Sequence, residues 1–491
     1  MYRIYLDWNI YKMVKDEPED AVAKDLKEIL LKHNDIIIPY STAHIQDLLK
    51  GSDKEENIPL IESDLSFIDE LSNYNNMQFD TKLNKTIPKV GSAHNLFKGF
   101  KDSELIDLLN PETLKDSVDF LKSPTLNKMI DALYNQKIDI DFNLFPEESN
   151  GIQLRKYFKR SQIDNTLQNL MLDYSALHKD LLNDPKIYQE IKKVFREYVG
   201  IDINHIMKSQ EPIKLIDNIL KTSPIKKSFD ELSTIDKTGK NEINSSFYMK
   251  YILEFTNLDL SGYHSDKLKS KNKYSNFTND TQHSFYGGHC DYFITKESKL
   301  IEKSNLLYSK YNISTKALKP EEFVQEIKIK LDYKLGIQDL FDAITKTFEN
   351  NLVRELEDYR TEGSKTILFK PEERILGYFN YAYYVLRDNK RQTFFLRNIS
   401  NSFSHFGFYD EIRSITNKLF KILGKDFHEN SSFENEEIEQ IDKDEWVGRY
   451  WVISNYYISL TFDNLANQLE LQFEQLTDEF IEEIQKTNAN T

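Results

Sequence analysis

Four acidic residues of this sequence stand where their carboxylates can gather around a metal ion. Asp7 ends an apolar run at residues 2–7, and Glu297 follows a second apolar run at residues 292–295. Asp280 begins an expected helix of about ten residues, and a tight turn joins this helix to the second run. The helix start and the strand end then lie side by side, so Asp280 meets Glu297. Carboxylates at close range raise one another's pKa, and Mg²⁺ or Mn²⁺, which prefer carboxylate oxygen, relieve the repulsion.

The elements near the start of the chain are expected to bring Asp47 to the same place. A helix is predicted over Asp20–His33 and a second strand over Ile36–Tyr40. Ser41 is a suitable N-cap for a further helix, which carries His44 and Asp47 on one face. Strand, helix, strand and helix in this order predict an α/β fold with a parallel sheet, whose ligands bind beyond the carboxyl ends of the strands.

Other polar residues near these acids have more modest expected roles. Asn9, Ser41 and Thr295 could orient the acids, although Ser41 is equally well explained as a helix cap. His44 and His283 could contact a phosphate, but a single histidine beside an acid is more often a hydrogen-bonded structural residue.

Asp291 begins the second strand, so we expect it roughly 15–20 Å from the other acids, at about 3.3 Å per residue. It becomes a metal ligand only if that strand begins later.

At this point the sequence resembles the PIN-domain nucleases. The resemblance covers roughly residues 1–90 and 245–325, about a third of the chain. Its pieces are LDWN with Asp7 and Asn9, PYSTAHIQDLLKG with Ser41 and Asp47, NDTQHSFYGGHCDYFITKE with Asp280, Thr295 and Glu297, and Lys303–Phe323, which is similar to the family's last helix and edge strand. The resemblance implies a metal-dependent phosphodiesterase, usually acting on RNA, with four acids around one or two Mg²⁺ or Mn²⁺ ions. The family often has Glu where this chain has Asp47, and usually Asp where it has Glu297, so the carboxylates are kept while their reach differs.

The length of the chain and its composition along the sequence indicate several domains. With 491 residues the chain is expected to form about two or three domains. We divide it into a PIN-like first half at 1–95, a helical insertion at 96–245, a PIN-like second half at 246–325 and a mainly helical α+β region at 326–491. The insertion could cover or gate the site, or only pack on the sheet. In the last region we expect a helix over Ile337–Arg360, and a hairpin from the alternation at residues 458–462 and 469–473.

The charge and the single cysteine restrict the classes of function. A net charge of −16 argues against a general nucleic-acid coat but not against a nuclease, since cations neutralise such a site locally. Cys290 is the only cysteine, which excludes an intramolecular disulfide and a multi-cysteine zinc site. We expect no signal peptide and no membrane span, and hence a cytoplasmic protein.

Two basic segments are candidates for binding a nucleic-acid backbone. They comprise Lys267, Lys269, Lys271, Lys273 and the possible stacking residue Tyr274, and then Arg155, Lys156, Lys159 and Arg160. Charge runs are more often solvated loops or helix faces that pair with acids.

The sequence therefore predicts a metal-dependent endonuclease, with RNA favoured over DNA because the resemblance favours it. The architecture suggests a regulated toxic role, for example in anti-phage defence. The C-terminal region is expected to mediate homo-oligomerisation or to bind a regulatory protein. Two alternatives remain open: a structure-specific DNA nuclease on the same scaffold, and an inactive PIN-like interaction protein. The pair Arg397 and His405 resembles the metal-independent HEPN ribonucleases more weakly.

Overall fold

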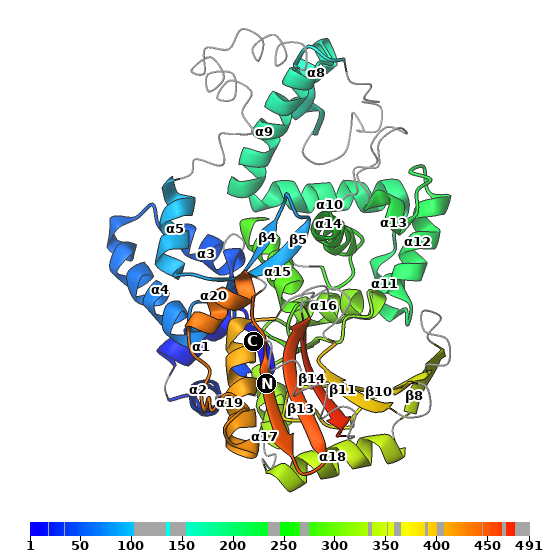
Figure 1. Cartoon of the computed structure of the whole chain (residues 1–491). Helices are drawn as coiled ribbons and strands as arrows, with labels where there is room; N and C mark the ends of the chain where they lie inside the picture. The colour runs from blue at the N-terminus through cyan, green and yellow to red at the C-terminus, as the bar shows by residue number, and fades with distance from the viewer. Residues whose placement is uncertain are drawn as a thin grey trace.

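The computed structural model describes residues 1–17, 19–33, 35–102, 134–137, 154–233, 246–265, 274–331, 336–350, 352–357, 365–387, 391–399, 407–443, 445–463 and 468–476. These residues form a mixed α/β structure with a parallel four-stranded sheet, many helices and a C-terminal antiparallel sheet of seven strands (Figure 1).

The parallel sheet has the strand order β2-β1-β6-β7, and all its neighbours run parallel. Its strands are β1 (Tyr2–Leu6), β2 (Ile36–Ile37), β6 (Tyr292–Ile294) and β7 (Lys316–Leu318). Side chains alternate along β1, so Ile4 and Leu6 join one buried cluster while Tyr5 joins the cluster on the opposite face. Both faces are covered, as is usual for parallel sheets. The predicted parallel α/β arrangement is confirmed.

Helices from distant parts of the sequence cover the two faces. Buried side chains of α1, α2, α4, α5 and α17 pack with Ile4 and Leu6, whereas those of α14, α15 and α16 pack with Tyr5. Their bounds are α1 (Trp8–Asp16), α2 (Ala21–Lys32), α3 (Thr42–Leu49), η1 (Glu55–Asn57), α4 (Ile58–Ser72), α5 (Ala93–Asp102), α14 (Phe247–Leu260), α15 (Tyr274–Gly287), α16 (Ser298–Lys310) and α17 (Pro320–Leu331). The predicted helices after Asp20 and Ser41 are confirmed, with both residues as N-caps.

Helix α15 differs from the prediction, because it starts at Tyr274 and places Asp280 in its middle rather than at its start. Its end approaches β6 closely. A Cβ on Gly287 would lie 2.7 Å from Cγ of Phe293, so only glycine allows this helix to lie so near the strand.

A small second sheet lies next to α3, which directly follows its first strand. It has the order β3-β4-β5, formed by β3 (Tyr40–Ser41), β4 (Asn75–Asp80) and β5 (Lys85–Val90). The segment around Pro88 pairs with β4 and forms the antiparallel β4–β5 hairpin.

The described part of the insertion is helical, as predicted. It consists of η4 (Leu154–Phe158), α8 (Lys159–Ile163), α9 (Leu167–Asn183), α10 (Pro185–Val199), α11 (Ile203–Lys208), α12 (Pro212–Thr222) and α13 (Phe229–Leu232). Helix α9 contacts α15, and α10 contacts α14, so the insertion packs directly on the helices of the α/β unit.

The C-terminal region is built around a sheet rather than being mainly helical, and that prediction is corrected. The antiparallel order is β12-β13-β14-β11-β10-β9-β8. The elements are α18 (Ile337–Asn350), β8 (Leu352–Glu357), β9 (Lys365–Phe369), β10 (Tyr381–Arg387), β11 (Arg391–Arg397), α19 (Tyr409–Leu423), α20 (Glu436–Asp442), β12 (Arg449–Ile453), β13 (Tyr456–Asp463) and β14 (Gln468–Gln475). The helix expected to reach Arg360 ends at Asn350, whereas the predicted hairpin is confirmed as β13 and β14.

Ion pairs, one of them buried, join this region to the amino end of the parallel sheet. Nε of Arg3 on β1 lies 2.6 Å from Oε1 of Glu411 on α19, and both side chains are almost fully buried. Arg374 pairs with Asp291, and Lys418 pairs with Asp35. The C-terminal region is therefore attached at the edge opposite to the one where Asp7 lies.

Candidate functional site at the carboxyl edge of the parallel sheet

Strand register sets the position of Asp7. Leu6 is paired with Ile294 on β6, and the backbone N–H of Asp7 donates to the carbonyl oxygen of Ile294 over 2.9 Å. Asp7 and Thr295 thus leave their strands side by side, at the carboxyl edge of the sheet. This is the edge that the sequence predicted.

The carboxylate of Asp7 is buried and held by three donors. Its Oδ1 accepts the backbone N–H of Trp8 over 2.7 Å, while Oδ2 accepts the Asn9 amide over 2.5 Å and the Thr295 hydroxyl over 2.6 Å. Burial raises the pKa of Asp7, and the nearby His283 and the Thr295 hydrogen bond offset this only in part. Asn9 and Thr295 hold the acid as the sequence analysis expected.

Asp47 on α3 is bound by donors from α15 and from its own helix. Its Oδ2 lies 2.9 Å from Nε2 of His283, while Oδ1 accepts from Asn279 and Lys50, each over 2.8 Å. Burial alone would raise the pKa of Asp47, but His283 and Lys50 outweigh it and the pKa is lowered. The carboxylate is therefore ionised and well satisfied.

Asp280, on the same helix as His283, lacks such support. Burial raises its pKa well above the usual value, and the charges of Glu297, Asp7 and Asp47 raise it further, in that order. Among the described residues no hydrogen bond or ion pair reaches its carboxylate. Glu297, at the N-cap position of α16, is exposed, and its N–H donates to the Thr295 hydroxyl over 3.2 Å. The four predicted acids thus share one electrostatic neighbourhood.

The acids do not surround a common point in the described arrangement. Within the described ranges, no group of three or more His, Cys, Asp or Glu side chains is placed to hold one metal ion. The contacts of Asp47 give the reason, because its two oxygens turn toward His283, Asn279 and Lys50. A divalent ion bound by all four acids therefore requires Asp47 to exchange these partners.

Asp291 lies at the opposite end of the sheet and does not join the acids. It precedes β6, accepts the backbone N–H of Arg3 over 2.8 Å, and pairs with Arg374. Burial would raise the pKa of Asp291, but the two arginines outweigh it and lower the pKa. Its role is structural, at the junction with the C-terminal region.

Ser41 and His44 complete the N-terminal cap of α3. The Ser41 hydroxyl accepts from the N–H of Ala43, and Nδ1 of His44 accepts from the N–H of Ser41 over 3.0 Å. Nε2 of His44 lies 2.7 Å from the carbonyl oxygen of Leu6. Burial, reinforced by His283, lowers the pKa of His44 to about 3, so its ring is neutral at pH 7. His44 is structural, as the sequence analysis favoured.

The described basic candidates for substrate binding, in η4 and α8, are not gathered at the acids. Lys267, Lys269, Lys271 and Lys273 lie outside the described residues, and Tyr274 begins α15. Arg155 and Lys156 lie in η4, and Lys159 and Arg160 in α8, at the end of α9 far from α15 (Figure 1). Arg160 pairs with Asp173 over 3.3 Å. Arg397 of the weaker HEPN comparison lies in β11, where it pairs with Glu470 and Asp463, and His405 lies outside the described residues.

Three contacts of the site were not anticipated from the sequence: those of His283, Asn279 and Lys50 with Asp47. The contacts of His283 and Asn279 join α15 to α3, which are far apart in the chain, whereas Lys50 is the C-cap residue of α3 itself. The spacing of Asn279, Asp280 and His283 on one helix is the signal that could have indicated them, because residues three and four apart share a face.

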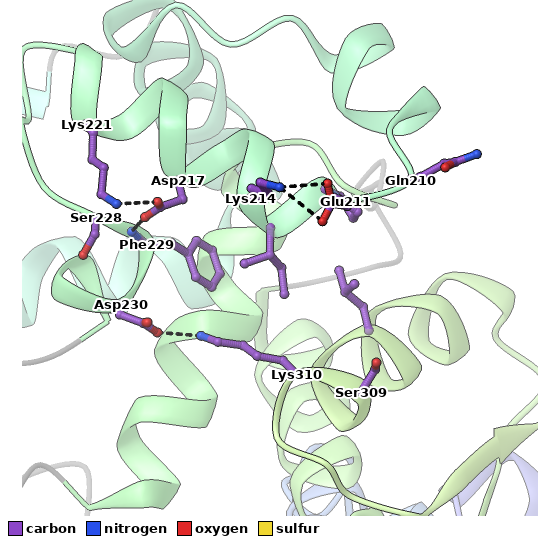
Figure 2. A pocket seen from close by; sticks show the side chains of 13 residues that line it. Gln210, Glu211, Lys214, Asp217, Lys221, Ser228, Phe229, Asp230, Ser309 and Lys310 are labelled. Carbon is purple, nitrogen blue, oxygen red and sulfur yellow. Dashed lines mark hydrogen bonds and ion pairs between the residues drawn. The ribbon is translucent and has the colours of Figure 1, made fainter.

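A separate pocket of about 550 Å³ lies between α12, α13 and α16 and contains none of the four acids (Figure 2). Its charged side chains are largely paired with one another. Lys221 lies 2.7 Å from Asp217, Lys214 lies 3.1 Å from Glu211, and Lys310 lies 2.6 Å from Asp230. This pocket therefore offers no unbalanced charge for a substrate.

Two wider observations complete the description of the site. None of the helices in the described part of the chain is long and apolar enough to cross a membrane. No protein-family model, no curated protein and no solved structure matches this chain.

Proposed function

We propose that this protein is a PIN-like, metal-dependent nuclease that hydrolyses phosphodiester bonds, with RNA as the favoured substrate. The observation that carries the proposal is the state of Asp280. Its carboxylate is desolvated, lies in the field of three other acids, and receives no hydrogen bond or ion pair from the described residues. Such a cluster is unfavourable unless a cation balances it.

The donor set fits a hard divalent cation. Mg²⁺ and Mn²⁺ prefer carboxylate oxygens, and Asp7, Asp47, Asp280 and Glu297 offer only those. When bound at such a site, a divalent ion lowers the pKa of a water molecule and stabilises the leaving oxygen of a phosphodiester.

The protein residues supply fixed positions rather than a nucleophile. Asn9, Thr295 and the N–H of Trp8 hold Asp7 in a single orientation, so that little reorganisation is needed when the charge of the substrate arrives. Lys50, released when Asp47 changes partners, becomes available to a phosphate at the rim of the site. Its side chain is already partly exposed.

The direct test is cleavage of total RNA, tRNA, single-stranded DNA and flap DNA, with Mg²⁺, Mn²⁺ or EDTA. We expect metal-dependent cleavage of RNA, abolished in Asp7→Asn, which keeps the shape and removes the charge. Asp25→Asn is the matched control, because Asp25 is an exposed acid that pairs with Lys328 on the surface. Cleavage of flap DNA alone would show that the substrate is structured DNA rather than RNA. Cleavage that persists in Asp7→Asn would refute the proposed site.

One observation favours a second candidate function, a non-catalytic interaction protein. Asp47 already has a donor for each carboxylate oxygen, and the described residues contain no preformed group of three ligands. Calorimetry with Mn²⁺ separates the two functions. An interaction protein of this kind binds no ion at the acids, whereas a nuclease does.

A further inference from the structure

We propose that an aromatic cavity between the β4–β5 hairpin, α14 and α15 binds the base of a nucleotide. These elements lie side by side (Figure 1). The cavity has a volume of about 380 Å³ and contains none of the four acids. Small-molecule sites usually have volumes of about 300–1,000 Å³. Binding at this cavity is additional to the proposed hydrolysis and does not require a metal ion.

Aromatic rings form most of the cavity wall. Phe79 on β4 stacks on Tyr248 of α14, with ring centroids 4.7 Å apart and an interplanar angle of 20°. Phe285 of α15 meets Tyr248 edge to face at 4.8 Å, and Phe247 meets Tyr311 in the same way at 4.8 Å. All five rings line the cavity, and all except Phe285 are only partly buried. Such rings favour a flat aromatic ligand that can stack on them.

Thr86 adds a polar group to this wall. It is paired directly with Phe79 across the β4–β5 hairpin, so the two side chains lie on the same face of the small sheet. Thr86 lines the cavity and is only 7 % exposed, and its hydroxyl has no hydrogen-bond partner among the described residues. Buried hydroxyls are usually satisfied, and the nitrogen and oxygen atoms at the edge of a base can provide the partner.

A positive charge stands at the rim of the cavity. Lys85 lines the cavity and is exposed, and its ammonium group makes no ion pair with any of the residues that the structure describes. Asp80, its neighbour across the hairpin, instead accepts the backbone N–H groups of Lys82 and Leu83. An exposed ammonium group complements a phosphate. A nucleoside monophosphate, which joins a flat base with polar edges to a phosphate, therefore matches the rings, the hydroxyl and the charge together.

Helix α15 connects this cavity with the acids. Phe285 follows Asp280 by five residues, which corresponds to about 7.5 Å along the helix axis. Beside Phe285, the Tyr286 hydroxyl lies 3.3 Å from the backbone nitrogen of Phe79 and 3.1 Å from the hydroxyl of Thr42, which begins α3. A free nucleotide and a nucleotide within a bound RNA present the same base and phosphate to the cavity, so the experiment must distinguish these two sources.

The test is calorimetric titration of the full chain with AMP, GMP, CMP, UMP, ribose 5-phosphate and a short single-stranded RNA. All titrations are made in EDTA, so that no divalent ion at the acids contributes to binding. We expect at least one nucleoside monophosphate to bind and ribose 5-phosphate, which lacks the base, not to bind. Additional binding of the RNA identifies the ligand as a base within a polynucleotide, whereas binding of free nucleotides alone identifies a nucleotide ligand.

Two variants assign the binding to this cavity. Tyr248→Leu removes a stacking ring, and we expect it to weaken nucleotide binding at least about fivefold. Lys85→Ala should weaken binding of the monophosphate but not of the corresponding nucleoside. Lys89→Ala is the matched control, because Lys89 is an exposed lysine of the same strand that does not line the cavity.

Three results would overturn the nucleotide site. They are the absence of binding by every nucleotide and by the RNA, equal binding of ribose 5-phosphate, and binding that Lys85→Ala and Lys89→Ala change to the same extent. Lys85→Ala decides the matter even if Tyr248→Leu does not fold. Each of these results leaves the nuclease proposal standing, because cleavage is measured separately with Mg²⁺ or Mn²⁺.

Discussion

Two acids of the site, Asp7 and Asp280, are both withdrawn from water but have opposite local support. Asp7 receives hydrogen bonds from Trp8, Asn9 and Thr295, whereas Asp280 receives none from the described residues. The first is held in one orientation by three hydrogen bonds, whereas the second is repelled by its neighbours' charges. We therefore expect substitutions of Asp7 and of Asp280 to shift the thermal midpoint of the cation-free protein in opposite directions.

We predict that Asp280→Asn raises the thermal midpoint in EDTA by ~1–3 °C, because it removes a repelled charge. The same substitution should abolish the stabilisation that Mg²⁺ or Mn²⁺ gives to the unaltered protein. Asp7→Asn is the matched comparison and should lower the midpoint in EDTA, because it breaks a satisfied set of hydrogen bonds. Calorimetric scans with and without the ions measure both effects. A lower midpoint for Asp280→Asn in EDTA contradicts the electrostatic account.

The lowered pKa of His44 leads us to predict that the folded protein loses stability in acid. Burial lowers its pKa from the ordinary value of 6.5 to about 3, so between these values the unfolded chain binds a proton that the folded chain does not. Stability contributed by the neutral ring is complete above pH 6.5 and falls as the pH drops toward 3. The maximum slope from one such group is about 1.4 kcal/mol per pH unit.

His44→Gln tests this contribution, because Gln at the third helical position can still accept the Ser41 N–H of the cap. Urea unfolding followed by circular dichroism at pH 7 and pH 5 should show a smaller loss of stability in the variant than in the unaltered protein. Equal losses would assign the acid sensitivity to other groups.

At the scale of elements, β1 connects two parts of the molecule. It carries Arg3, bound to Glu411 on α19, and leads directly into Asp7 at its other end. Both charged groups of the Arg3–Glu411 pair are buried, so removing one partner leaves an uncompensated charge.

We predict that Glu411→Gln lowers the free energy of unfolding by roughly 3–5 kcal/mol. The double variant Arg3→Met/Glu411→Leu should recover most of this loss, since the remaining apolar groups pack without a desolvated charge. Denaturant unfolding of Arg3→Met, Glu411→Leu and the double variant measures the coupling. Additive losses in the double variant would show that the pair is not linked in this way.

The arrangement of helices and strands could be predicted from the sequence only in part. The run ending at Asp7, the cap at Ser41 and the apolar run before Thr295 are local patterns, so the parallel sheet and its acidic edge were predictable. Helix α15 begins at Tyr274 rather than at Asp280, so Asp280 is not its N-cap. The contact of His283 with Asp47 depends on packing between α15 and α3, and the helical spacing of Asn279, Asp280 and His283 indicates only that they share a face.

The C-terminal sheet was missed for a different reason. Pro371-Glu372-Glu373 resembles a helix start, but the Tyr-rich β10 that follows pairs with β9 and β11 on both sides. In the same way Leu352 and Leu356 continue the apolar spacing of α18 and yet belong to β8. Pairing with strands that are distant in the sequence therefore made these segments strands rather than helices.

For the whole molecule, the net charge of −16 implies that substrate binding depends on the site rather than on a general basic surface. We propose, as part of the nuclease function, that the activity is toxic when unregulated, for example in anti-phage defence. Induced expression of the unaltered protein should slow bacterial growth, whereas Asp7→Asn at the same protein level should not. Harmless expression of protein that cleaves RNA in vitro would rule out this role.

The central claim is that the acids at the carboxyl edge of the parallel sheet hold a divalent cation. The most direct measurement is anomalous X-ray scattering from crystals of the protein soaked in Mn²⁺. The account predicts an anomalous peak within coordination distance of Asp7 and Asp280, absent in Asp7→Asn crystals treated in the same way. A fully soaked crystal with no peak at these acids, or with Mn²⁺ bound only elsewhere, would contradict the account.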